Sequence, residues 1–126
     1  MTLSVYFKSI IDQDTSSVVI CDLNDMIIYM NPAAKENYRK HNGGELTGRS
    51  ILDCHNAASG EKIHKVVSWF QESRENNRIF TFHNAKQNKD VYMVALRDED
   101  GKLIGYYEKH EYRNPETAET YAFGKA

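Results

Sequence analysis

The sequence has few of the residues that define specialised classes of protein. Only two cysteines and two prolines occur among its 126 residues, so it has neither the paired-cysteine framework of a small secreted scaffold nor a Cys-x-x-Cys zinc motif. No apolar run approaches the roughly 20 residues that cross a bilayer, and the N-terminus does not show the basic-then-apolar pattern of a signal peptide. We therefore expect a cytoplasmic protein with no membrane partner.

An excess of charge of one sign is also missing. Sixteen basic residues against eighteen acidic ones give a net charge of −2, which provides no basic footprint for nucleic acid. What is present is typical of a globular protein, with 40% hydrophobic and 27% charged residues. A chain of this length forms one domain and buries a core without disulfides or metals.

Two segments have the apolar spacing of amphipathic helices. Leu3 to Ile11 is a short one, which needs a partner surface to be stable. The longer one carries Ile63, Val66, Val67 and Phe70 at i, i+3, i+4 and i+7. We expect it to follow a hinge of small residues at 57–60 and to stop at Asn76-Asn77.

The remaining patterns predict strands and turns. Val18 to Cys21 and Met26 to Met30 flank an Asn/Asp-rich turn, which predicts a β-hairpin. Asn31 then precedes Pro32 as the expected cap of a short helix. Three later strands, at 79–83, 91–96 and 103–112, predict an antiparallel meander. The fold class is therefore α+β, a five-stranded antiparallel sheet with helices packed on one face, plus the N-terminal helix at 1–15, the domain proper at 16–113 and a tail at 114–126.

Three local motifs in this order resemble the PAS domain family over 16–113. The stretch VICDLNDMIIYMNPAA is similar to the opening hairpin of that family, followed by Asn and a small-residue helix. ELTGRS at 45–50 resembles its turn, and DEDGKLIG at 98–105 resembles its final hairpin. Two departures stand out, Asp25 where the family usually has Gly and Cys54-His55-Asn56 in place of its usual His-Pro-Asp-Asp. The resemblance implies a signalling module, usually dimeric, that binds a small ligand or a partner protein.

Helix phase and strand alternation place a ligand pocket between the longer helix and the sheet. The residues predicted to line it are His55, Ile63, Val67, Phe70, Phe82, Met93 and Tyr106. Occupancy would stabilise one packing of the helix against the sheet, and the N-terminal helix or the exposed sheet face would then present a changed homodimer surface.

Other functions remain open from the sequence. Haem is the one cofactor that the family resemblance leaves open, and His55 or His64 would then be its axial ligand. The protein would otherwise be a ligand-free interaction module with a filled core. Cys54 and His55 are a nucleophile and a base, but adjacent residues rarely face each other and no third group orients them, so we expect no enzyme activity. No metal site is expected, because no ligands share a recognisable spacing.

Overall fold

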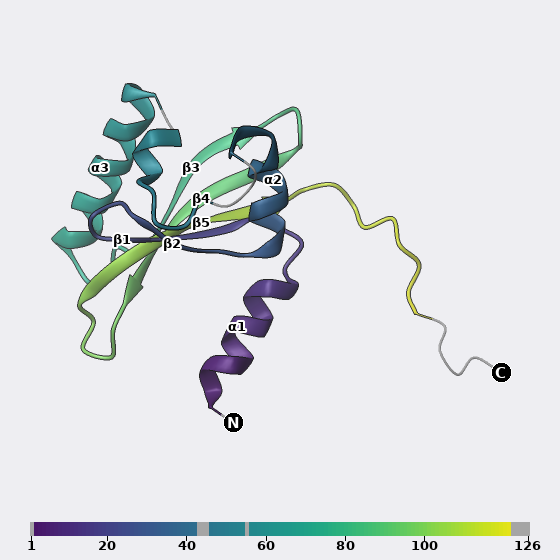
Figure 1. The fold of residues 1–126 in the computed structure, drawn as a ribbon, viewed down its shortest axis with the longest axis horizontal. Helices are drawn as coiled ribbons and strands as arrows, with labels where there is room; N and C mark the ends of the chain where they lie inside the picture. Colours follow the sequence, from purple (N-terminus) through teal and green to yellow (C-terminus); the bar gives the residue numbers. More distant parts are fainter. Residues whose placement is uncertain (1, 43–45, 55, 122–126) are drawn as a thin grey trace.

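One sheet with helices on both sides organises the chain (Figure 1). The structure, a computed structural model, describes residues 2–42, 46–54 and 56–121. None of its described helices is long and apolar enough to cross a membrane. The elements in chain order are α1 (Leu3–Gln13), β1 (Val18–Asp22), β2 (Ile27–Met30), α2 (Pro32–Asn42), the 3-10 helix η1 (Ile51–Cys54), α3 (Ala57–Glu72), β3 (Arg78–Asn84), β4 (Lys89–Arg97) and β5 (Leu103–Tyr112).

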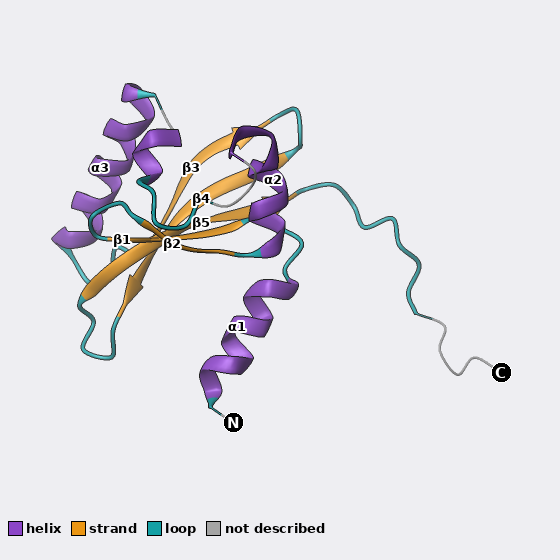
Figure 2. Ribbon diagram, viewed as in Figure 1, coloured by secondary structure: helices purple, strands orange, loops and turns teal. Residues whose placement is uncertain are grey.

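The five strands form an antiparallel sheet in the order β2-β1-β5-β4-β3, so the last strand of the chain lies at its centre. Residues from α2, η1 and α3 join the core on one face, which we call the inner face. The last turns of α1 lie beside the opposite, outer face (Figure 2). There the hydroxyl of Tyr29 on β2 donates a hydrogen bond to the carboxylate of Asp12. The predicted α+β fold class is confirmed.

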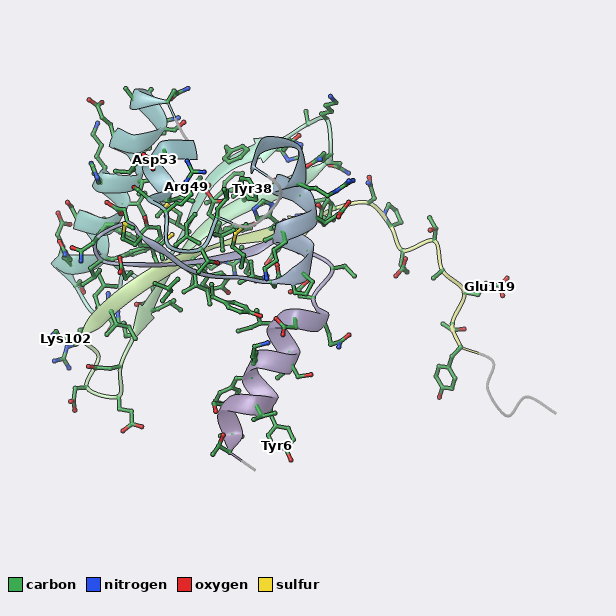
Figure 3. The ribbon with its side chains drawn as sticks, in the orientation of Figure 1. Tyr6, Tyr38, Arg49, Asp53, Lys102 and Glu119 are labelled. Carbon is green, nitrogen blue, oxygen red and sulfur yellow. The ribbon has the colours of Figure 1, made fainter. Side chains whose placement is uncertain are left out.

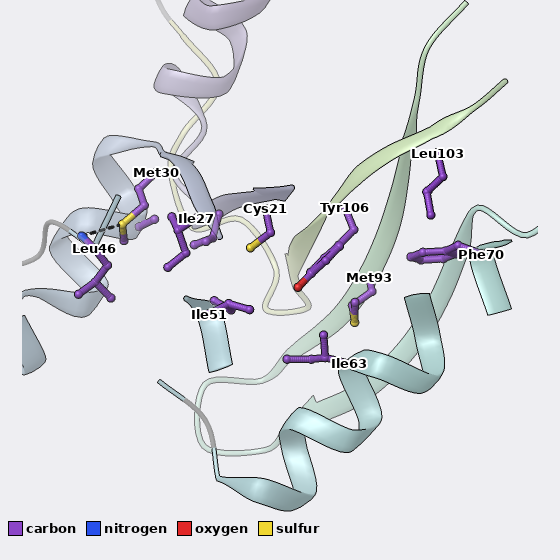
Figure 4. Packing of buried hydrophobic residues seen from close by; sticks show 12 residues of the cluster. Cys21, Ile27, Met30, Leu46, Ile51, Ile63, Phe70, Met93, Leu103 and Tyr106 are labelled. Carbon is purple, nitrogen blue, oxygen red and sulfur yellow. Dashed lines mark hydrogen bonds between the residues drawn. The ribbon is translucent and has the colours of Figure 1, made fainter. Parts of the chain in front are cut away.

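The core is apolar and continuous between the inner face and the three helices (Figure 4). Phe70 of α3 is fully buried, and Ile63 is 6% exposed. Burying such side chains contributes roughly 1.5–3 kcal/mol each. The other buried members come from β1, β2, α2, η1, β4, β5 and the segment between α2 and η1, and they are Val19, Cys21, Ile27, Met30, Ala34, Leu46, Ile51, Met93, Leu103 and Tyr106.

The start of α3 corrects one prediction. The small residues at 57–60, expected to be a hinge, form the first turn of this helix. Asn56 is its N-cap, and its side chain accepts a hydrogen bond from the backbone N–H of Ser59 at 2.8 Å. That bond satisfies one of the free N–H groups of the first turn, so a short run of small residues becomes helical.

The end of α3 is fixed by an arginine from the sheet. The helix ends at Glu72, before the predicted stop at Asn76-Asn77. One nitrogen of the Arg97 guanidinium on β4 donates to the carbonyl oxygens of Phe70, Ser73 and Asn76, at 2.7, 3.1 and 3.2 Å. The carbonyl of Phe70 is one of the last in α3 and has no partner within the helix, and those of Ser73 and Asn76 belong to the turn that follows. Arg97 therefore caps α3 and ties the helix and this turn to β4.

Asn31 joins three elements in the interior. It is fully buried, and its side-chain oxygen accepts from the backbone N–H groups of Val18 and Ala34, both at 2.9 Å. Its amide nitrogen donates to the carbonyls of Ile11 at 2.9 Å and Ser16 at 3.0 Å. The predicted cap of α2 is confirmed, and the same side chain also fixes β1 and the end of α1.

The two ends of the described chain extend away from the sheet (Figure 3). Apolar side chains of α1 lie in solvent, with Leu3 63%, Phe7 55% and Ile10 69% exposed. Beyond Tyr112, the described residues of the tail form no helix or strand. Arg113 ties the start of the tail to the sheet, since it bonds Asp90 on β4 at 2.8 Å.

Candidate functional site

A cavity of about 470 Å³ lies between α3 and strands β3, β4 and β5. Its size is within the range of roughly 300–1,000 Å³ that is typical of small-molecule sites. The helix supplies one wall and the outer strands supply the other. The lining residues are Ser59, Lys62, Ile63, Lys65, Val66, Ile79, Phe80, Thr81, Phe82, Met93 and Glu108.

A β-bulge in β3 shapes the strand side of this cavity. Ile79 pairs with Met93, whereas Phe82 pairs with Val91, so the register shifts by one residue at Thr81. The Thr81 hydroxyl donates to the carbonyl of Val91 at 2.9 Å. Because paired residues share a face, the extra residue brings both Ile79 and Phe82 to the inner face.

The helix side of the cavity is one flank of α3. At about 100° per residue, Ser59, Lys62 and Val66 lie on one side of Ile63, and His64 and Val67 lie on the other. Of the predicted pocket residues, Ile63, Phe82 and Met93 line the cavity. Phe70 and Tyr106 belong to the buried core, Val67 packs half-buried against it, and His55 lies outside the described residues.

The sequence reasoning missed the polar residues of the cavity. Ser59, Lys62 and Lys65 recur every three residues along one flank of α3, and that spacing was the available signal. Neither lysine has an ion-pair partner within the described part of the chain. Glu108 of β5 lies at the opposite wall, and its side chain is 22% exposed.

The inner face continues beyond Glu108 with buried polar groups. The Glu108 carboxylate lies 3.6 Å from Nε2 of His110, and Nδ1 of His110 is buried with no hydrogen-bond partner among the described residues. Lys89 is 4% exposed; its burial lowers the pKa of the ammonium group, while the charge of Glu108 acts to raise it. The deep wall therefore carries a carboxylate within a polar cluster.

Asp25 connects the core to the surface of α3. It has a φ of 62° in the turn between β1 and β2, a left-handed conformation that suits the Gly usual in the family but that Asp also tolerates. Its carboxylate accepts a hydrogen bond from the buried Tyr106 hydroxyl at 2.7 Å and lies 3.3 Å from Nε2 of His64. The departure from Gly thus provides a link between α3 and the sheet.

Cys21 and Tyr106 are both unreactive in this core. Burial raises the pKa of the Cys21 thiol to about 12, so no thiolate forms near neutral pH. Burial, followed by the hydrogen bond to Asp25, also raises the pKa of Tyr106. The side chain of Cys54 and the whole of His55 lie outside the described residues. The structure therefore does not describe how the predicted nucleophile and base lie relative to each other.

The position of His64 does not fit the axial ligand of a haem bound in this cavity. Its imidazole is 60% exposed, contacts Asp25 and lies on the flank of α3 that faces away from the cavity. His83 is paired with Asp90 at 2.7 Å, and no histidine of the described residues lines the cavity. Within the same residues, no cluster of three His, Cys, Asp or Glu side chains is placed to hold a metal ion.

The sheet, the helices packed on it and the cavity between them form an α+β fold, and comparison with known proteins identifies its family. The profile described as "PAS domain" matches residues 15–108, well over half of the chain. The chain belongs to the PAS domain family, and is a PAS sensory or signalling domain. A search of curated proteins finds no match.

Solved structures share the fold at low identity. A C-terminal domain from Streptococcus mutans has a TM-score of 0.66 at 20% identity, covering 86% of this chain and 84% of its own. A PAS domain from Colwellia psychrerythraea has a TM-score of 0.60 at 12% identity, covering 89% and 98%. The Aer2 receptor from Vibrio cholerae, described as a dual PAS-heme oxygen sensor, has a TM-score of 0.54 at 18% identity, covering 75% and 90%.

Proposed function

We propose that this PAS domain is a sensor that binds a small molecule in the cavity beside α3 and passes the signal on as a change in helix packing. The observation that supports this function is the cavity itself, about 470 Å³ with apolar walls from Ile63, Val66 and Met93. A ligand that binds only when α3 and the sheet are suitably spaced shifts the population toward that packing. The domain itself performs no catalysis in this proposal.

Filling the cavity tests this function. In Val66→Trp the indole enters the space that the ligand would occupy, and we expect small molecules that denaturation releases from the wild type to be absent from this variant. The readout is mass spectrometry of the released material, beside urea unfolding to show that the protein still folds with a loss of no more than about 3 kcal/mol. Ser68→Trp is the matched control, because Ser68 is exposed and does not line the cavity.

Two results would contradict the proposal. The same molecule released in equal amount from Val66→Trp would place the ligand elsewhere. A wild-type protein that releases nothing, and whose cavity resonances do not move in an NMR screen of small molecules, would instead support the second candidate, a ligand-free interaction module. The exposed apolar residues of α1 favour that second candidate.

For the output, we propose a homodimer formed through α1. Leu3, Phe7 and Ile10 lie within about 60° on one side of the helix and are all more than half exposed. An isolated helix of 11 residues is unstable in water, and a second copy of α1 would cover this side. A neighbouring groove of about 250 Å³ lies between α1 and the outer face of the sheet.

Phe7→Glu is expected to convert the dimer to a monomer, because it places a charge in the middle of this apolar side. Light scattering after size-exclusion chromatography measures the mass. Ser9→Glu adds the same charge at an exposed position on another side of the helix and should leave the dimer intact. A wild-type protein that is monomeric at about 100 µM would rule out this output, since stable interfaces have far lower dissociation constants.

A further inference from the structure

The rim of the cavity carries hydrogen-bond donors. Ser59, Lys62 and Lys65 line it from one flank of α3, three residues apart, so they are neighbours along the helix surface. Both lysines are exposed, and neither has a carboxylate partner within the described residues. The neighbouring carboxylate of Glu61 does not line the cavity, so the charges that α3 contributes to the lining are both positive.

The deep wall has the opposite charge. Glu108 lines the cavity from the central strand β5, and its carboxylate is mostly buried beside His110. Between rim and wall, the contacts are apolar, from Ile63, Val66 and Met93. The cavity therefore has ammonium groups at its mouth, apolar side chains in its middle and one carboxylate at its deep end, with His110 and Lys89 beside that carboxylate but outside the lining.

We infer that the ligand is a monocarboxylate with an apolar body, such as a medium-chain fatty acid or an aromatic acid. Its carboxylate lies at the mouth beside the ammonium groups of Lys62 and Lys65, and its apolar part lies between α3 and the sheet. Glu108 disfavours the reverse orientation, because two carboxylates that share a site repel each other. This inference rests on the proposed function, since it names the ligand class of the same cavity.

The lysines are tested with decanoate as the probe, in isothermal titration below its micellar concentration. In Lys62→Gln/Lys65→Gln we expect binding to weaken about tenfold, as two exposed ion pairs at about 0.7 kcal/mol each predict. Raising the salt from 50 to 500 mM should narrow the difference from wild type, because exposed charges are screened. Lys86→Gln/Lys102→Gln removes the same charge at exposed positions that do not line the cavity and should bind like wild type.

Glu108 is tested with a second probe, decanedioate, which carries a carboxylate at both ends. We expect wild-type protein to bind it at least about fivefold more weakly than decanoate, a cost of about 1 kcal/mol. In Glu108→Gln this difference should become smaller, and what remains is the cost of removing the second carboxylate from water. A decanedioate that binds the wild type as tightly as decanoate does would overturn the assigned orientation.

The outcomes separate this inference from the proposed function. If 1-decanol binds as tightly as decanoate and the lysine variant binds both like wild type, the carboxylate class is wrong, while ligand binding in the cavity stands. If none of the three probes binds, the ligand class is also overturned, and the small molecules released from wild type and Val66→Trp still decide whether the cavity holds a ligand. Decanoate binding that Val66→Trp leaves unchanged would overturn both.

Discussion

Gly105→Ala is expected to destabilise the domain by at least about 4 kcal/mol, the range of the most damaging single substitutions. Gly105 pairs with Asp22 across the two central strands β5 and β1. A methyl group at this position would lie 2.3 Å from the carbonyl oxygen of Cys21, a backbone atom that cannot move without separating the strands. A glycine inside a strand marks such a close approach. Urea unfolding followed by circular dichroism measures the loss.

Gly60→Ala is the control for this substitution. Its new methyl group would lie 3.6 Å from Cδ2 of Leu52, an ordinary contact, in the first turns of α3. Because alanine is the better helix former, we expect the free energy of unfolding to rise by about 0.5–1 kcal/mol. A Gly105→Ala variant that unfolds with the same midpoint as wild type would contradict this close approach of β5 to β1.

Asn31→Ala is expected to cost about 3 kcal/mol or more. The substitution leaves the buried N–H of Val18 without the partner that Asn31 provides at 2.9 Å, and it removes the donor to the carbonyl of Ser16 at 3.0 Å. Each buried polar group left without a partner costs about 1–3 kcal/mol, and the lost cap of α2 adds about 1 kcal/mol. Urea unfolding measures the sum.

Hydrogen exchange distinguishes this role from a general loss of packing. Because Asn31 also bonds the carbonyl of Ile11, amides in the last turn of α1 should exchange faster in Asn31→Ala than the global loss of stability explains. Asn24→Ala changes an exposed asparagine of the neighbouring turn, and should alter stability by less than about 0.5 kcal/mol. Equal exchange of α1 in both variants would contradict the proposed connection.

The secondary structure was predictable because its apolar periods are clear. The stripe from Ile63 to Phe70 predicts α3, and the alternation in β4 predicts a strand with one buried face. The start of α3 was not predictable in this way, because 57–60 contains no periodic apolar residues. Its helical form depends on the hydrogen bond from Ser59 to Asn56, which spacing alone does not reveal.

The cavity was harder to predict than the fold because its position depends on a bulge. Strict alternation places Ile79 and Phe82 on opposite faces of a strand, whereas the shift at Thr81 brings both to the inner face. A one-residue change of register reverses the face of every residue beyond it. On α3, a rotation of about 100° separates Val66, which lines the cavity, from the predicted Val67.

The guanidinium of Arg97 anchors the C-terminal end of α3. It holds the carbonyls of Phe70, Ser73 and Asn76 at the C-terminal end of the helix, whereas the cavity opens beside Ser59, Lys62 and Val66 near the other end. In the proposed sensor, a molecule bound there would act on the part of α3 remote from Arg97. The contact of His64 with Asp25 would then connect a movement of α3 to the turn between β1 and β2. Strand β2 follows this turn and ends at Met30, next to Asn31. The side chain of Asn31 bonds the carbonyl of Ile11 in α1.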